Sequence, residues 1–477
     1  MQEQLSKILH DIQTTSVTDN SNLVTKGCIF FAIKGTKTDG HKYIISALEK
    51  GAKTIIIDKG QEQETQKITK NYIAVTDSRE ALAFVAAKKY SLPRSIVAIT
   101  GTDGKSSTAF FYKEILTALK INAAAIGTMG VLSNKKEDYF KKFDILTTPG
   151  TLQLYKILEE LREADVNCVS LEASSHGICQ KRLDFIPLKA AAFTSFGRDH
   201  LDYHKDFHEY LEAKLRLFNT LLPSTGIAVI NNDSAVAPQV LKACGDREKL
   251  TYGTNGTFIK IEDVTYHNTK MSAKFIIAGK DYSIYSNLFG DFQIYNLACA
   301  IALLHATGYS YKDCIEVIPS LNSVPGRMQR VDGFNIFIDF SHTPDALKKA
   351  LTVLKHGISK SGRIIVVFGC GGDRDKGKRS LMGQIADEFS DIAIITDDNP
   401  RTEDPSVIRE EIKKHCKKGI NIGSREKAIE YAIKEIKDGD VLVIAGKGHE
   451  TYQILADRTI DFNDYKIAQY YACQHLV

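Results

Sequence analysis

No two of the nine cysteines in the 477-residue sequence form a CxxC pair, and their number is odd. Both features argue against a disulfide framework or a zinc site and are typical of a reducing cytosol. No run of about 18 apolar residues occurs, so no membrane-spanning helix is predicted. The N-terminal segment also lacks the apolar region of a signal peptide. We therefore expect a cytoplasmic protein without membrane insertion.

The sequence also lacks an excess of charge of one sign. Its 62 Lys and Arg residues against 58 Asp and Glu residues give a formal net charge of +4 at pH 7. Basic residues are scattered, so no nucleic-acid partner is expected. The hydrophobic share of 43% and the charged share of 25% are those of a globular protein. The length allows two or three domains, and no internal repeat occurs.

Short apolar runs alternate with helical patterns along most of the chain. This alternation predicts an α/β protein with doubly wound parallel sheets. Polar/apolar alternation over residues 260–287 predicts an antiparallel meander instead. We predict three domains: a small N-terminal α/β domain over residues 1–92, a central P-loop ATPase domain with a parallel sheet over 93–325, and a Rossmann-like α/β domain over 326–477. Pro and Gly in the segment 323–333 predict a hinge or linker.

A glycine-rich stretch, G-x-x-G-K-S, follows the apolar run 95–100. Glycines let backbone N–H groups turn inward around a phosphate, and the start of the next helix adds partial positive charge. Lys105 can then reach the terminal phosphates and the Ser106 hydroxyl can bind Mg²⁺. An empty glycine turn is the alternative, but the strand–loop–helix context favours ATP. The predicted nucleotide loop consists of Gly101, Thr102, Asp103, Gly104, Lys105, Ser106 and Ser107.

Further polar residues stand near the ends of predicted strands or in helices. Glu172 ends an apolar run, where ligands of open α/β sheets lie, and suits the Mg²⁺ of a nucleotide. A solvated loop acid is the alternative. His200, His204 and His208 fit either a metal cluster or a harmless shared helix face. Lys214 lies between apolar residues of a predicted helix, where a lysine that snorkels to solvent is the default interpretation.

Three polar loops follow predicted strands of the C-terminal domain. They present Arg374; Asp398, Asn399 and Arg401; and Lys447, His449 and Glu450. On one carboxyl edge they would form a binding wall for a small zwitterionic or anionic ligand, in which an arginine fork suits a carboxylate. The residues alone leave a kinase, an ATPase motor and an ATP-driven ligase open.

A set of short segments in a fixed order resembles the Mur ligase family of peptidoglycan synthesis. The segments are TGTDGKSS, TTPGT, EASSHG, GRDHLDYH, EAKLRLF, VPGRMQRV, IDFSHTPDAL, GCGGDRDKGKR, DDNPRTEDP and GKGHETYQ. The resemblance implies an N-terminal domain that binds UDP, a central ATPase domain and a C-terminal domain that binds an amino acid. It implies ATP-dependent ligation of meso-2,6-diaminopimelate to UDP-N-acetylmuramoyl-L-alanyl-D-glutamate through an acyl phosphate. Mg²⁺ would be the cofactor, the substrates small molecules, and the protein a monomer.

The resemblance also assigns roles to the matching positions of this sequence. The catalytic set would be Lys105, Glu172, His200 and Lys214. Mg²⁺ would be held by Ser106, Glu172, His200 and Lys214, the last as a carbamate formed with CO₂ (N6-carboxylysine). Asn296, Arg327 and Asp339 would join the loop in binding ATP. Residues for the UDP-muramoyl-dipeptide would be Ser21, Thr147, Thr148, Ser174, Gln180 and Arg182. Residues for diaminopimelate would be Arg374, Asp398, Asn399, Pro400, Arg401, Gly446 and Glu450.

The choice of amino acid depends on the segment DNPR at residues 398–401. In the family this form goes with diaminopimelate, and lysine-adding members lack the arginine. Arg401 would pair with the second carboxylate of diaminopimelate, whereas L-lysine would leave the guanidinium unpaired. Arg374 would help to hold a carboxylate and Glu450 the distal ammonium.

The sequence departs from the family's pattern at a few positions. Asp103 stands where the family has Asn, residues 20–22 read NSN instead of DSR, Phe340 and Ser341 replace Tyr and Ala, and Gln329 replaces Glu. Three alternatives are open: the same step with L-lysine, a folylpolyglutamate-synthase-like ligase, and a nucleotide-dependent regulatory protein.

Overall fold

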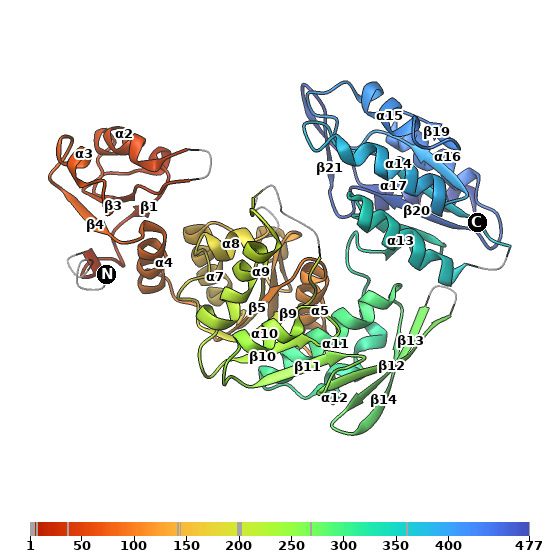
Figure 1. The fold of residues 1–477 in the computed structure, drawn as a ribbon, viewed down its shortest axis with the longest axis horizontal. Helices are drawn as coiled ribbons and strands as arrows, with labels where there is room; N and C mark the ends of the chain where they lie inside the picture. The colour runs from red at the N-terminus through yellow and green to blue at the C-terminus, as the bar shows by residue number, and fades with distance from the viewer. Residues whose placement is uncertain are drawn as a thin grey trace. The chain divides into compact units, whose positions relative to one another are not determined.

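A computed structural model describes residues 5, 8–35, 38–140, 143, 145–197, 203–267, 270–358 and 361–476 (Figure 1). The chain divides into two compact units. The first consists of Met1–Tyr252 and Cys299–Cys314, and the second of Gly253–Ala298 and Ile315–Val477. Both are built from α/β layers, which confirms the predicted fold class; the boundaries of the three predicted domains stay a prediction.

The N-terminal part of the first unit is a four-stranded parallel sheet in the order β1-β2-β3-β4. Its middle strands are buried on both faces, as the apolar runs predict. Its strands are β1 (Val17–Thr18), β2 (Ile29–Phe31), β3 (Thr54–Asp58) and β4 (Tyr72–Val75). Its helices are η1 (Ser21–Leu23), η2 (Gly40–Tyr43), α2 (Ile44–Glu49), α3 (Glu62–Gln66) and α4 (Ser78–Lys89).

The larger sheet of the first unit has the strand order β11-β10-β9-β5-β8-β6-β7. Only β7 runs antiparallel to its neighbour among these strands. The strands are β5 (Ser95–Thr100), β6 (Ala123–Gly127), β7 (Gly130–Ser133), β8 (Cys168–Glu172), β9 (Leu188–Phe193), β10 (Ile227–Asn231) and β11 (Lys249–Gly253). Because β5 lies between β8 and β9, the segments after these three strands emerge at the same edge.

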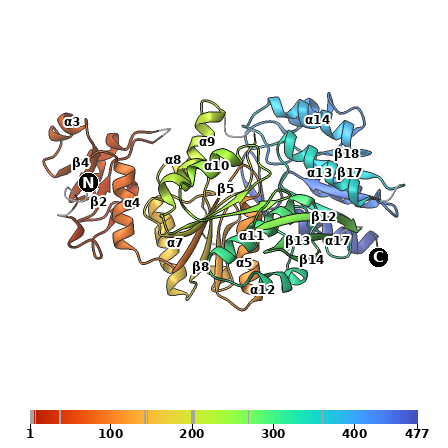
Figure 2. The same cartoon turned by 60° about the horizontal axis from the view of Figure 1, so that its bottom comes forward.

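Helices lie on both sides of this sheet (Figure 2). They are α5 (Lys105–Ala118), α6 (Glu137–Phe140), α7 (Thr151–Glu163), α8 (Ser175–Cys179), α9 (Phe207–Arg216) with the π-helical continuation η3 (Leu217–Leu221), α10 (Ala237–Ala243) and α12 (Tyr311–Glu316). Helix α11 (Asp291–Ala306) and helix α12 each contain residues of both units.

The second unit contains a six-stranded sheet in the order β15-β16-β20-β17-β18-β19. Only β15 is antiparallel to its neighbour. Val366 packs into the hydrophobic cluster on one face and Val367 into that on the other, so the doubly wound sheet predicted from the sequence is confirmed. The strands are β15 (Gln329–Arg330), β16 (Ile336–Asp339), β17 (Ile364–Phe368), β18 (Ile392–Ile395), β19 (Gly419–Asn421) and β20 (Val441–Ala445).

Helices and two smaller β elements complete the second unit. The predicted meander is present as three antiparallel strands, β12 (Ile259–His267), β13 (Lys270–Ile277) and β14 (Lys280–Ser286). The hairpin consists of β21 (Tyr452–Ile454) and β22 (Thr459–Asp461). The helices are η4 (Ile318–Ser320), α13 (Pro344–Gly357), α14 (Gly377–Phe389), α15 (Pro405–Lys413), α16 (Arg425–Lys434) and α17 (Asp464–His475).

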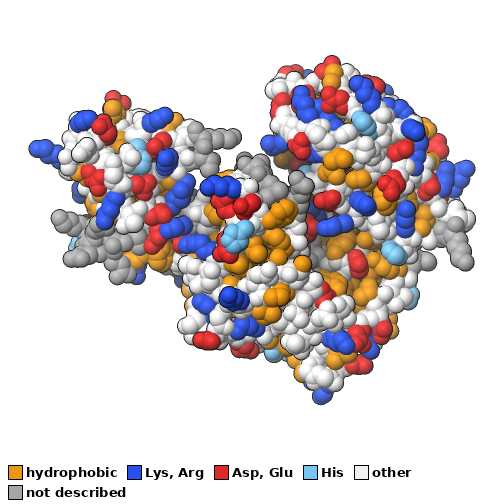
Figure 3. Space-filling model, in the orientation of Figure 1, with side chains coloured by type: hydrophobic (Ala, Val, Ile, Leu, Met, Phe, Trp, Pro, Cys, Tyr) orange, Lys and Arg blue, Asp and Glu red, His pale blue; other side chains and the backbone are white. Residues whose placement is uncertain are grey.

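The surface charges and the length and apolarity of the helices agree with what the composition predicts. On the face shown in Figure 3, basic and acidic side chains are mixed rather than gathered by sign. Within the described part of the chain, no helix has the length and apolarity that a bilayer crossing requires.

The segment 323–333, predicted as a hinge or linker, contains a tightly packed turn and the short strand β15. Gly326 has φ +63°, and a Cβ there would lie 2.1 Å from the backbone nitrogen of His449. The Gly326 N–H donates to Gln329 Oε1 over 2.9 Å, and the Met328 N–H donates to Asp339 Oδ2 over 2.7 Å. Gly326 therefore allows a close approach between two loops, and the hinge itself stays a prediction.

An ion pair between buried Asp440 and partly exposed Arg363 connects the amino ends of β17 and β20. The Asp440 side chain is 2% exposed and accepts hydrogen bonds from the Arg363 backbone N–H and from its Nε and Nη2. Burial by itself raises the pKa of the Asp440 carboxyl, but the hydrogen bonds from Arg363 and from the Lys437 N–H lower the pKa overall. The pair therefore stabilises the fold only while this carboxyl is ionised.

We expect Asp440→Asn to lower the free energy of unfolding by about 2 kcal/mol at pH 7, because charged hydrogen bonds become neutral ones. Since the folded-state pKa lies below the unfolded value near about 4, the contribution is present above that value and is lost as the pH falls through the folded pKa. Urea unfolding from pH 7 to pH 3 measures the difference between variant and parent. A difference that stays constant over this range would contradict the prediction.

Candidate nucleotide and amino-acid sites

The glycine-rich loop joins β5 to α5 with two glycines in the left-handed region. Gly101 has φ +147° and Gly104, which caps α5, has φ +88°. A Cβ at Gly101 would lie 2.0 Å from Thr194 Oγ1. The sequence therefore needs glycine here both for backbone conformation and for the close approach of the loop to the segment after β9. Ser106 and Ser107 are buried at the first turn of α5.

Two residues after β9 hold the loop in place. Thr194 Oγ1 donates to the carbonyls of Thr100 and Asp103, over 3.1 and 2.5 Å. The Asp103 N–H donates to Ser195 Oγ over 2.9 Å. Sequence reasoning missed these supports, although they directly follow a strand next to β5. Asp103 itself is exposed, so its departure from the family's Asn does not bury a carboxylate.

Two lysines donate hydrogen bonds to the loop: Lys105 at the start of α5 and Lys214 in α9. Lys105 Nζ donates to the carbonyls of Gly101, over 2.9 Å, and Thr102, over 2.7 Å. Lys214 Nζ donates to the same Gly101 carbonyl over 2.7 Å and lies 4.5 Å from the centre of the Tyr210 ring. Lys214 is 1% exposed. The snorkelling interpretation is therefore wrong, because the side chain points into the protein and ends at the nucleotide loop.

Glu172 is a buried carboxylate at the carboxyl end of β8. It is 1% exposed and accepts hydrogen bonds from the Thr128 N–H, over 2.9 Å, and from Thr128 Oγ1, over 3.1 Å. A Cβ at Gly127 would lie 2.0 Å from Glu172 Oε1. The alternative of a solvated loop acid is wrong. Thr128 was not found from the sequence, since nothing marks a threonine in a turn as the partner of an acid 44 residues later.

The residues predicted for the muramoyl-dipeptide gather beside Glu172. Thr148 Oγ1 donates to the Glu172 carbonyl over 2.8 Å and lies 2.9 Å from Ser174 Oγ. Arg182 donates from Nη1 to the Thr148 carbonyl over 2.5 Å and from Nη2 to Gln180 Oε1 over 2.6 Å. The structure therefore brings these side chains into one hydrogen-bonded cluster.

Two further predicted residues differ in their position. Thr147 Oγ1 lies 3.1 Å from Thr128 Oγ1 and so adjoins the Glu172 site. Ser21 lies in η1, where its carbonyl accepts a hydrogen bond from Lys50 Nζ over 2.9 Å. Among the described residues, no hydrogen bond links Ser21 to the cluster around Thr148.

His204 and His208, the two described members of the predicted histidine group, do not share a helix face. His204 is buried ahead of α9, with its ring 5.9 Å from that of His176, while His208 is exposed on α9. His200 lies outside the described residues. Within the part of the chain that the structure describes, no three His, Cys, Asp or Glu side chains are grouped as for a metal ion. The spacing of four was misleading because the helix begins only at Phe207.

The other predicted ATP residues lie in the second unit. Gln293 connects two of them, because its Oε1 accepts from Asn296 Nδ2 over 3.2 Å and its Nε2 donates to the Arg327 carbonyl over 3.0 Å. The Arg327 guanidinium lies 4.6 Å from the centre of the Phe340 ring. The replacement of the family's Tyr by Phe340 thus keeps an aromatic surface under this arginine.

Asp339 ends β16 and is 8% exposed. It accepts hydrogen bonds from the backbone N–H groups of Met328, over 2.7 Å, and Ser341, over 2.9 Å, and from the Ser341 hydroxyl. Burial raises the pKa of this carboxyl. Ser341, another departure from the family, therefore adds a hydroxyl donor to Asp339.

The three polar loops of the second unit lie on one edge, as predicted. They follow β17, β18 and β20, and these strands are parallel neighbours in the order β20-β17-β18. Two glycines let the loops meet, because a Cβ at Gly372 would lie 1.9 Å from the Pro400 carbonyl oxygen and one at Gly371 would lie 2.8 Å from Arg401 Nη1. Arg374 is exposed on the loop after β17.

Arg401 is held by backbone groups of two other loops. It has φ +53°, which is uncommon for a residue with a side chain. Its N–H donates to the Ile454 carbonyl over 3.2 Å, and its Nη1 donates to the carbonyls of Gly372, over 2.9 Å, and Asn399, over 3.3 Å. No hydrogen bond of Nε or Nη2 is found within the described residues. These groups suit a bidentate carboxylate.

Asn399 joins the second loop to the third. It is 3% exposed, its Nδ2 donates to Glu450 Oε2 over 2.9 Å, and its Oδ1 accepts from Lys447 Nζ over 3.0 Å. Gly446 has φ +114°, and a Cβ there would lie 2.8 Å from Asp398 Oδ2. The wall thus presents carboxylates, an amide and a guanidinium from adjacent loops.

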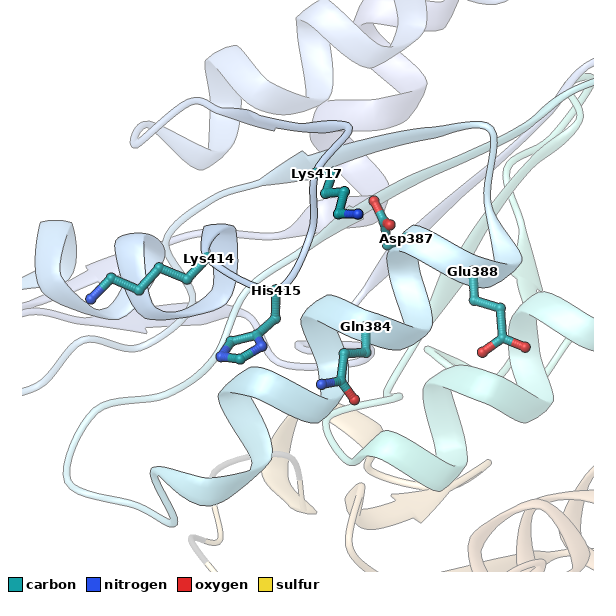
Figure 4. A pocket seen from close by; sticks show the side chains of 6 residues that line it. All are labelled: Gln384, Asp387, Glu388, Lys414, His415 and Lys417. Carbon is teal, nitrogen blue, oxygen red and sulfur yellow. The ribbon is translucent and has the colours of Figure 1, made fainter.

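A hollow of about 480 Å³ lies elsewhere on the second unit, at the C-terminal half of α14 (Figure 4). It is lined by Gln384, Asp387, Glu388, Lys414, His415 and Lys417. These side chains carry both signs of charge and point in different directions. They do not converge on one point, so the hollow is not a candidate for the site.

The sequence matches three family models over most of its length. Residues 13–90 match "Mur ligase family, catalytic domain", residues 99–304 "Mur ligase middle domain" and residues 326–448 "Mur ligase, glutamate ligase domain". The chain belongs to the Mur ligase family. This Mur ligase is 40% identical over 461 residues to the UDP-N-acetylmuramoyl-L-alanyl-D-glutamate–2,6-diaminopimelate ligase of Rhizobium meliloti strain 1021, covering 95% of this chain and 93% of that protein.

Solved structures show the same Mur ligase architecture. A structure of a UDP-N-acetylmuramoyl-L-alanyl-D-glutamate–2,6-diaminopimelate ligase has a TM-score of 0.71 and 31% identity, covering 96% of this chain and 95% of that one. The folylpolyglutamate synthase of Mycobacterium tuberculosis, complexed with ADP and AMPPCP, has a TM-score of 0.60 and 17% identity, covering 77% of this chain and 92% of that one. The second similarity shows a shared fold alone.

Proposed function

We propose that this Mur ligase joins meso-2,6-diaminopimelate to the D-glutamate carboxylate of UDP-N-acetylmuramoyl-L-alanyl-D-glutamate, with ATP converted to ADP and phosphate. The observation that supports this most strongly is the wall formed by Arg401 and Glu450. It offers a guanidinium from the loop after β18 and a carboxylate from the loop after β20, and both loops lie on the same edge of the sheet. A diaminopimelate end group carries the complementary carboxylate and ammonium.

The chemistry explains why a phosphate loop accompanies an amino-acid site. A carboxylate is a poor electrophile, so its oxygen first takes the γ-phosphoryl group as the P–O bond to ADP breaks. The amine of diaminopimelate then attacks the acyl phosphate, forms the C–N bond, releases phosphate and loses a proton. Lys105 and the amino end of α5 would offset the negative charge of two anions brought together.

The donors near the loop suit Mg²⁺ and a carbamate. Ser106 and Glu172 offer buried hydroxyl and carboxylate oxygens, which Mg²⁺ prefers. A carbamate formed from CO₂ on Lys214 would keep one N–H for the Gly101 carbonyl, so the hydrogen bond of that side chain is compatible with the modification. We propose His200 as a further ligand. When bound, Mg²⁺ would neutralise charge on the phosphate oxygens.

Binding of the other substrates follows from the clusters already described. We assign the dipeptide to the cluster around Thr148 and Arg182, the uracil nucleotide to Ser21, and the base, phosphate and ribose of ATP to Asn296, Arg327 and Asp339. Residues 1–92 would hold UDP, 93–325 ATP and 326–477 the amino acid. We further propose that the enzyme acts in the cytoplasm as a monomer.

Phosphate release with ATP and Mg²⁺ tests this function. We expect release that requires both the UDP-muramoyl-dipeptide and meso-diaminopimelate, and far slower release with L-lysine or L-ornithine as the amine donor. Faster turnover of L-lysine would assign the same step with another amino acid. Turnover of a folate with glutamate would instead favour a folylpolyglutamate-type ligase, and ATP hydrolysis without any acceptor would favour a regulatory ATPase.

A further inference from the structure

Lys447 is a fully buried lysine directly after β20. Its side chain is 0% exposed, and its Nζ donates to Glu450 Oε2 over 2.9 Å and to Asn399 Oδ1 over 3.0 Å. The Nζ also lies 5.6 Å from the centre of the Tyr452 ring. A buried ammonium needs a counter-charge and hydrogen-bond acceptors. Here both acceptors are residues assigned to the amino-acid wall.

A second buried cation at the same sheet edge, Arg425, differs from Lys447 in the residue that supplies its counter-charge. Arg425 is 2% exposed and donates from Nε and Nη2 to the two oxygens of Asp464, over 2.8 and 2.7 Å. Asp464 is itself fully buried and is not part of the wall. Arg425 thus has a counter-ion of its own, whereas the carboxylate paired with Lys447 belongs to a residue that faces the ligand.

The hydrogen bonds to Lys447 divide the two oxygens of Glu450 between different tasks. Oε2 accepts from Lys447 Nζ and from Asn399 Nδ2, each over 2.9 Å. No hydrogen bond of Oε1 is found within the described residues, and the side chain is 21% exposed. One oxygen is therefore fixed by the protein and the other is left for a ligand.

The same ammonium fixes the orientation of the Asn399 amide. Its Oδ1 accepts from Lys447 Nζ and from the Ile454 N–H over 2.9 Å, so its Nδ2 must face Glu450. Without Lys447 the amide would lose its charged donor, and rotation would place a carbonyl oxygen against the Glu450 carboxylate.

We propose that Lys447 is a positioning residue for the amino-acid site, which sets Glu450 and Asn399 in the orientation that receives the ammonium group of the incoming amino acid. This inference rests on the proposed function. Lys447 does not touch the ligand, because its side chain has no exposed surface; it acts through the carboxylate and the amide that it holds.

The test is Lys447→Met in the full-length enzyme, with the KM of each substrate measured separately. We expect the KM for meso-diaminopimelate to rise by about 10-fold or more, because charged hydrogen bonds to the wall are lost. The KM values for ATP and for the UDP-muramoyl-dipeptide should change by less than about 2-fold, since Lys447 contacts neither proposed site. A diaminopimelate KM within about 2-fold of the parent's, or an equal rise for all three substrates, would overturn the proposal.

Two controls separate positioning from general destabilisation. Arg363→Met breaks the ion pair with Asp440 at the amino ends of β17 and β20, whereas the wall lies at their carboxyl ends. This variant should lower the melting temperature and leave the diaminopimelate KM unchanged. On a Glu450→Gln background, Lys447→Met should raise the KM by less than about 3-fold, because it acts through Glu450. If the two substitutions raised the KM independently, so that their fold-changes multiplied in the double variant, Lys447 would not act through Glu450. If Lys447→Met does not fold, Lys447→Gln, which keeps a donor group, replaces it with the same criteria.

Failure of the proposed function would be recognised separately. If the parent enzyme used L-lysine instead of meso-diaminopimelate, the function would be wrong in its amino acid. The KM comparison would then be made with L-lysine, whose side-chain ammonium is the same group. A selective rise would uphold the role of Lys447, and an unchanged KM would overturn it.

Discussion

Replacement of Lys105 by methionine is expected to lower substrate-dependent phosphate release by about 10³-fold, the scale of losing a preorganised charge at a reacting group. Lys105 opens α5 and curves back over the glycine loop to the carbonyls of Gly101 and Thr102. In that position its charge would face the phosphoryl group that moves from ATP to the carboxylate. Methionine keeps the length of the side chain and removes the charge, so the fold of the loop should remain.

The matched control is Lys120→Met. Lys120 is an exposed lysine just beyond the other end of α5, and we expect its variant to match the parent in rate and in melting temperature. Single-turnover phosphate release with saturating ATP measures the step directly. If Lys105→Met kept more than about a tenth of the parent's rate, the loop would not act through this charge.

Arg401→Ala is expected to lower kcat/KM for meso-diaminopimelate by about 10³-fold or more while changing that for L-lysine far less. A site that hydrogen-bonds one group of its substrate discriminates strongly against an analogue without that group. Arg401 is held in place by the protein, because its backbone N–H and its Nη1 donate to carbonyls of neighbouring loops. Removing the guanidinium takes away the partner of the second carboxylate, which L-lysine does not have.

The control for this prediction is Arg458→Ala. The Arg458 side chain is 67% exposed, between β21 and β22, so its removal should leave the ratio of the two kcat/KM values unchanged. The measurement is the ratio of meso-diaminopimelate to L-lysine turnover in parallel assays. A ratio unaffected by Arg401→Ala would mean that specificity lies elsewhere in the wall.

Much of the site could be located from local patterns. The glycine loop was predictable because neighbouring residues determine both its backbone conformation and the start of the following helix. Gly101 and Gly104, for example, have positive φ. The wall was predictable because parallel strands place their following loops on one edge, whatever the rest of the fold does. The position of Glu172 at the end of an apolar run indicated a ligand role but left its burial open, and only the resemblance pointed to Lys214.

Other features depend on contacts between distant segments. Thr128 holds Glu172, Thr194 holds the glycine-rich loop, and Lys447 donates to Asn399, which lies 48 residues earlier, as well as to Glu450. No periodicity marks such residues, since a threonine or a lysine after a strand is ordinarily a solvated turn residue. The packing of Gly326 against residues 448 and 449 was likewise not predictable, because the composition of a turn does not reveal what packs against it.

The sequence by itself determined the α/β layers, the glycine-rich loop between β5 and α5, and the order of the polar loops, because hydrophobic period and glycine placement act over a few residues. The tertiary structure decided which polar side chains are buried, which oxygen of Glu450 accepts hydrogen bonds from Lys447 and Asn399, and where the Lys214 side chain ends. These depend on desolvation and on hydrogen-bond partners brought from far along the chain, and both exist only once the sheets have packed.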